Sequence, residues 1–129
     1  MGSSRPGNNQ TQVVIGDDPS DTVNFVVDRE IFWVSKSHNE VVEWFCVRNQ
    51  NGHVHGSPNP CFTVRFNKLN GSPFAHPDPS NPSYTSDSTG YAVSNPVKHT
   101  VSPDSNRLYG YTIEAIGKNP LDPGGGVKG

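Results

Sequence analysis

The chain has 129 residues, a formal net charge of -2 and a pI near 6.2, and 31% of its residues are hydrophobic. Its ten basic residues are scattered singly, which argues against nucleic acid as a partner. No apolar run approaches the roughly 20 residues that span a bilayer, and the polar start lacks the apolar core of a signal peptide. We therefore expect no nucleic-acid partner, no membrane contact, no signal peptide and no transmembrane segment, and the compartment stays unknown.

Glycine (13 residues) and proline (12 residues) interrupt the chain throughout. Both break helices, and no segment keeps an apolar period of 3.6 residues for long, so the sequence predicts an all-β protein. A chain of this length is expected to form one domain. We expect a flexible tail over residues 1–10, a single β-sandwich domain over 11–117 and a Gly-rich C-terminal segment over 118–129.

The first half of the chain contains the clearest strand patterns. Apolar residues alternate with polar ones there, which is typical of half-buried strands. Strands are predicted at 11–15, 22–27, 31–35 and 40–48. In the last and strongest of these, Val42, Trp44 and Cys46 share one face because successive side chains of a strand point to opposite sides.

The second half is predicted to hold shorter strands between long loops rich in Pro, Gly, Ser and Asn. These strands are expected at 61–66, 91–93, 98–101 and 107–116. Residues 67–88 contain four prolines and read as a long loop, which in a compact domain is usually a binding loop or a mobile segment. We expect Tyr84 and Tyr91 to offer partner contacts there, whereas residues 119–129 are too rich in glycine for an assignment.

Three segments carry motifs that resemble the cupredoxin family. Asn39–Trp44 is similar to its turn followed by V-x-W, Phe62–Phe66 to its H-x-V-x-F strand, and Tyr109–Ile113 to its final Y-x-Y-x-C strand. The likeness covers roughly residues 22–116. It implies a small antiparallel Greek-key β-sandwich that is cupredoxin-like.

The copper ligands of that family are not retained at the matching positions. A type 1 copper site needs two His, one Cys and usually a Met. In the resemblance, Phe62 stands at the first His position and Ile113 at the Cys position, and the only Met is Met1. The resemblance therefore implies the fold without the copper chemistry.

Two pairs of side chains remain candidates for a metal or a disulfide. In an extended segment, His53 and His55 would point to one face about 7 Å apart, which suits copper or zinc if a further ligand joins them; otherwise they are exposed loop imidazoles. Cys46 and Cys61 are expected to face each other across a long hairpin, as a disulfide or as two buried thiols. A zinc site made of all four side chains has suitable ligands but no standard spacing.

The sequence contains no recognised catalytic motif, and we expect no enzyme activity. The favoured function is a non-catalytic β-sandwich interaction or assembly protein, without a cofactor, that binds a protein partner or associates with itself. The alternative is a metal-binding or copper-handling protein that uses the surface histidines His53 and His55. A hydrolase or isomerase with a site assembled from scattered residues is a third, weaker reading. The missing copper ligands favour the first.

Overall fold

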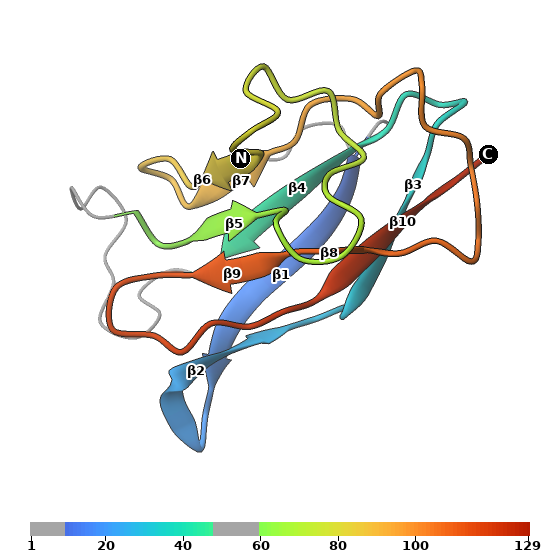
Figure 1. The fold of residues 1–129 in the computed structure, drawn as a ribbon. Coiled ribbons are helices and arrows are strands. Elements are labelled where there is room, and N and C mark those ends of the chain that lie inside the picture. Colours follow the sequence, from blue (N-terminus) through green and yellow to red (C-terminus); the bar gives the residue numbers. More distant parts are fainter. Residues whose placement is uncertain (1–9, 48–59) are drawn as a thin grey trace.

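Ten β-strands and no helix are found in residues 10–47 and 60–129, the part of the chain that the computed structural model describes (Figure 1). The longest strands come first: β1 (Gln10–Asp18), β2 (Asp21–Val27), β3 (Ile31–Ser35) and β4 (Val41–Cys46). The second half holds β5 (Thr63–Arg65), β6 (Ser83–Thr85), β7 (Tyr91–Val93), β8 (Tyr109–Gly110), β9 (Thr112–Glu114) and β10 (Gly124–Lys128). The prediction of an all-β protein is confirmed.

The strands form two layers. The first layer is a four-stranded sheet in the order β2-β1-β4-β7. The second consists of two three-stranded sheets, β3-β10-β8 and β6-β5-β9. These two sheets are continuous, because β8 and β9 are separated only by Tyr111, whose backbone N–H donates to the Pro123 carbonyl, and Ile113 exchanges backbone hydrogen bonds with Leu121. The arrangement is consistent with a β-sandwich.

Strand direction differs from the antiparallel prediction. Among the described strands, β1 pairs in parallel with β4 and β10 pairs in parallel with β3, while the other five pairings are antiparallel. The sandwich is therefore mixed. Alternation of apolar residues predicts that a segment is a strand, but it does not predict which strand lies beside it.

Three local predictions are wrong. Within the long loop expected over 67–88, residues 83–85 form β6, which pairs with β5. The long hairpin expected between the segments that carry Cys46 and Cys61 does not form, because β4 belongs to the first layer and β5 to the second. The strand expected at 98–101 is a turn in which the Val101 N–H donates to the Lys98 carbonyl. Residues 1–9 of the expected tail lie outside the described residues, and Gln10 already belongs to β1.

The core lies between the two layers. Valines, isoleucines and aromatic side chains of both layers are buried in one cluster. At its centre, the Trp44 indole N–H donates to the Tyr111 hydroxyl oxygen at 3.2 Å, and the two rings lie 5.6 Å apart. This bond satisfies two polar groups that would otherwise be costly to bury. Phe74, from the loop predicted over 67–88, is also fully buried, so that part of the loop packs into the core.

The Gly-rich C-terminal segment forms β10, which lies between β3 and β8 (Figure 1). Gly125 pairs with Phe32 and Gly126 with Trp33, and each aromatic ring occupies the space that a Cβ on the opposite glycine would need. The aromatic rings thus cover two of the three glycines with which this five-residue strand begins, and Val127 adds its own side chain to the core. Residues 124–128 are an integral part of the second layer.

Candidate functional site

The histidine pair His53 and His55 lies outside the described residues, so the metal site proposed for it stays a prediction. Within residues 10–47 and 60–129, no group of three or more His, Cys, Asp or Glu side chains is arranged to hold a metal ion. His76, an imidazole within the described residues, uses both ring nitrogens: Nδ1 accepts from the Asp78 N–H at 2.8 Å, and Nε2 lies 2.8 Å from the Ser83 carbonyl oxygen.

The positions at which the cupredoxin resemblance would place copper ligands are apolar and buried. Phe62 and Ile113 both have no exposed surface. Ile113 pairs with Val64 across β9 and β5, so the two segments that carry the family motifs are adjacent. This end of the sandwich is packed with hydrocarbon side chains rather than with ligands.

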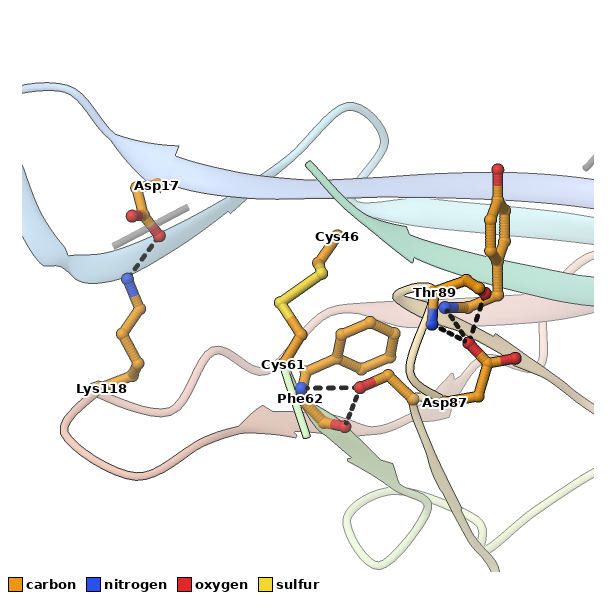
Figure 2. The surroundings of a disulfide bond; sticks show 9 residues. Asp17, Cys46, Cys61, Phe62, Asp87, Thr89 and Lys118 are labelled. Carbon is orange, nitrogen blue, oxygen red and sulfur yellow. Dashed lines mark hydrogen bonds and ion pairs between the residues drawn. A yellow bond between two sulfur atoms is a disulfide. The ribbon is translucent and has the colours of Figure 1, made fainter. Parts of the chain in front are cut away.

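Cys46 and Cys61 form a disulfide in the structure, with Cα atoms 6.5 Å apart (Figure 2). Cys46 is the last residue of β4 and Cys61 stands two residues before β5, so the bond joins the two layers. Both residues are buried. On the Cys61 side, Phe62 is fixed by Ser86, whose hydroxyl accepts from the Phe62 N–H and donates to its carbonyl oxygen. The disulfide therefore sits in a well-ordered part of the core.

A buried ion pair joins Asp17 to Lys118 (Figure 2). The Lys118 ammonium donates to the Asp17 carboxylate at 2.5 Å and also to the Thr22 carbonyl. It lies 4.7 Å from the centre of the Phe25 ring, which adds a cation–π interaction. The side chains of Lys118 and Asp17 are only 3% and 8% exposed. The pair fastens the loop that carries Lys118 to the β1–β2 hairpin.

The two tyrosines expected to contact a partner are tied to the fold. The Tyr84 ring stacks on Trp44 at 5.8 Å, and its hydroxyl donates to the Asn95 side-chain oxygen at 2.9 Å. Burial raises the pKa of the Tyr84 hydroxyl to about 12, although the Asn95 backbone N–H, which donates to the Tyr84 hydroxyl oxygen at 3.3 Å, acts in the opposite direction. The Tyr91 ring packs against Phe45 with centroids 4.5 Å apart. Much of each ring surface is thus already occupied.

The structure shows a groove on the second layer that the sequence had not indicated, which we call the Gly124 groove. Its volume is about 620 Å³. Its walls are the apolar side chains of Val27, Ile31, Leu69, Leu108, Leu121 and Pro123. Ile31 and Leu69 are 44% and 55% exposed, so this part of the lining presents apolar surface to the solvent.

Two glycines form the floor of the Gly124 groove. Gly124 pairs with Ile31 on one side and with Gly110 on the other, so a single row crosses β3, β10 and β8. Since Gly125 faces the buried Phe32 ring, its neighbour Gly124 faces outward. A Cβ on Gly124 would touch only the Tyr109 carbonyl oxygen, at an ordinary 3.5 Å, so the space above Gly124 is open.

A turn builds the wall of the groove that lies opposite Ile31. Asn70 and Gly71 have positive φ angles of 64° and 68°, a conformation that asparagine and glycine tolerate best. The Asn70 side-chain amide donates to the Leu108 carbonyl at 2.7 Å, and the Gly110 N–H donates to the Leu69 carbonyl at 3.0 Å. These bonds hold Leu69 over Gly110. The wall is therefore preformed.

Three charged side chains stand at the rim of the groove: Glu30, Lys68 and Asp122. Glu30 directly precedes β3, and Asp122 stands two residues before β10, whereas Lys68 belongs to the opposite wall. Asp122 accepts a hydrogen bond from the Thr112 hydroxyl at 2.7 Å. Within the described residues, the side chains of Glu30 and Lys68 form neither a hydrogen bond nor an ion pair. Their charges are available to a ligand.

No family model, curated protein or solved structure matches this chain. The described residues also contain no helix that is long and apolar enough to cross a membrane.

Proposed function

We propose that the chain is a non-catalytic interaction or assembly protein that binds a protein partner, or a second copy of itself, through the Gly124 groove. The observation that carries this proposal is the pair of exposed aliphatic walls, Ile31 and Leu69, held apart over a glycine floor. All but three lining residues are apolar or glycine. Burying such surface on a partner yields about 25 cal/mol for each Å² removed from water.

The size and rigidity of the groove also support binding. Its volume of about 620 Å³ lies within the range of about 300–1,000 Å³ that is typical of ligand pockets. Because the Leu69 wall is held by backbone and side-chain hydrogen bonds, a partner would not need to order it. A preformed apolar groove with a few charges at its rim is suited to recognition rather than to bond making.

Strand addition at the β2 edge is a less suitable mode of contact. The Asn119 N–H donates to the Val23 carbonyl, and the Asn119 side chain donates to Asn24 at 2.8 Å. Together with the Lys118 bond to the Thr22 carbonyl, these contacts cover a stretch of the edge that a partner strand would need. The structure therefore supports the groove over this edge as the binding surface.

The cupredoxin-like Greek-key topology without copper is part of this proposal. It is supported by the position of the family motifs: Asn39–Trp44 leads into and through β4, Phe62–Phe66 contains β5, and Tyr109–Ile113 spans β8 and most of β9. It is also supported by the apolar packing of Phe62 and Ile113, where the family would have ligands.

The proposal is tested with a variant that fills the groove. Gly124→Val places a side chain into the open space and suits a strand, whereas Gly129→Val adds the same group where nothing lies within 4 Å. Peptides selected from a random display library on the native protein should bind Gly129→Val equally and Gly124→Val at least about tenfold more weakly. The proposal fails if no peptide is enriched, provided that sedimentation shows no self-association through the groove, or if Gly124→Val binds as well as the native protein.

The metal-binding alternative is tested on the same protein by titration with Cu(I), Cu(II) and Zn(II). Under the proposal, metal binding stays at the weak level of two loose imidazoles. Tight stoichiometric binding that is lost in His53→Ala or His55→Ala would instead assign the chain to metal handling.

A further inference from the structure

We infer that the occupant of the Gly124 groove is a segment of a partner protein that carries a branched apolar side chain next to a basic residue. This inference rests on the proposed function and adds the chemistry of the partner. It is drawn from the floor, the walls and the rim charges of the groove.

The floor and walls select an apolar side chain. Above Gly124 there is open space, and the facing walls are the aliphatic side chains of Ile31 and Leu69. A leucine, isoleucine or valine of the partner placed there would contact hydrocarbon on both sides and peptide backbone below. A polar side chain would lose its water without gaining a hydrogen-bond partner from these walls, which is costly.

The width of the groove suits one apolar side chain. The row Ile31, Gly124 and Gly110 crosses three neighbouring strands, and Leu69 covers Gly110, so the row runs from one wall to the other. With strands about 4.8 Å apart, the row spans about 10 Å. An apolar side chain of the partner therefore fits over Gly124, and the residue next to it in the partner lies at the rim.

The rim selects a basic neighbour. Two carboxylates, Glu30 and Asp122, stand on the side of β3 and β10, and one ammonium group, Lys68, stands on the opposite wall. Because Glu30 has no hydrogen bond or ion pair within the described residues, a basic side chain of the partner can bind it without breaking an existing contact. Two carboxylates and one ammonium group leave the rim with one excess negative charge, so a lysine or arginine is favoured over a glutamate, which only Lys68 would attract.

The experiment compares three peptides of equal length, with blocked termini, whose central pairs are Leu-Lys, Leu-Glu and Ser-Lys in a Gly/Ser background. Affinities for the native protein are measured by calorimetry. Leu-Lys should bind most tightly, and Glu30→Gln should weaken it by up to about fivefold, as expected for one exposed ion pair. Asp21→Asn, which removes the same charge outside the groove, is the matched control and should leave the affinity unchanged.

The outcomes separate the inference from the proposed function. If Leu-Lys and Leu-Glu bind with equal affinity, and Gly124→Val binds neither peptide, the groove binds apolar peptides and the inferred preference for a basic residue is refuted. If Leu-Glu binds more tightly, the inference is reversed. If none of the three peptides binds, the inference fails, and the display experiment decides separately whether the groove is a binding site.

Discussion

Gly125→Ala should destabilise the sandwich, although alanine is a better strand residue than glycine by about 0.5–1 kcal/mol. A Cβ on Gly125 would lie 2.1 Å from Cζ of Phe32 and 2.3 Å from its two Cε atoms. The Phe32 ring cannot move aside easily, because it is fully buried and packs against Trp44 at 6.2 Å and Tyr111 at 5.8 Å. Overpacking a core costs about 1–3 kcal/mol. Because the ring is fixed, Gly125→Ala is expected to lower the free energy of unfolding by about 2 kcal/mol.

Gly124→Ala is the matched control, since it introduces the same methyl group into the same strand. Its Cβ would meet only the Tyr109 carbonyl at 3.5 Å, so its stability should equal or slightly exceed that of the native protein. Urea unfolding followed by tryptophan fluorescence measures the free energy of unfolding of both variants. Its dependence on urea concentration should be the same as in the native protein. For a chain of this size, 2 kcal/mol corresponds to about 8 °C in Tm. Equal stability of Gly125→Ala and Gly124→Ala would refute the aromatic cover over β10.

Three further predictions concern the contacts within the core. Replacing Cys46 and Cys61 together by alanine should lower the free energy of unfolding by about 3 kcal/mol, because their bond closes a loop across 15 positions; an unchanged urea midpoint in the absence of reductant would contradict this. Lys118→Met removes the ammonium group from the buried Asp17 carboxylate and should cost about 3 kcal/mol, and a loss below about 1 kcal/mol in the same assay would show that the pair is dispensable. Tyr84 has a pKa raised to about 12 from 10.0 in the folded state, so the stabilisation from its protonated hydroxyl is complete below pH 10 and is lost as the pH rises to about 12. In Tyr84→Phe, the urea midpoint should decrease less between pH 9 and 12 than in the native protein. Identical pH profiles of the two proteins would refute the role of Tyr84 in this loss of stability.

The sequence predicted the long strands whose side chains alternate, and it missed the short β6 and also β10, of whose five residues three are glycine. Residues 22–27 and 31–35 were expected as strands and correspond to β2 and β3, because valine and phenylalanine mark their buried faces. Residues 124–128 show no alternation of apolar and polar side chains. The rings that fill the space beside Gly125 and Gly126 belong to Phe32 and Trp33 of β3. A strand whose packing groups are supplied by its neighbour cannot be identified from its own residues.

The candidate site was out of reach for a related reason. The Gly124 groove depends on the pairing of β10 with both β3 and β8, and such pairing between distant segments leaves no local pattern. The residue types of Cys46 and Cys61 drew attention to a bond between them, but the expected hairpin was wrong because these residues lie on facing layers. Composition indicated which residues could react, and only the topology determined their neighbours.

The position of β10 has a consequence for synthesis of the protein in the cell. It is the last strand in chain order, yet it lies inside the second layer, between β3 and β8. A nascent chain that has not yet released residues 124–128 from the ribosome leaves both neighbouring strands with open edges and leaves Phe32 and Tyr109 without their cover. Open edges and uncovered aromatic residues promote aggregation. The sheet β3-β10-β8 therefore cannot form before residues 124–128 have left the ribosome.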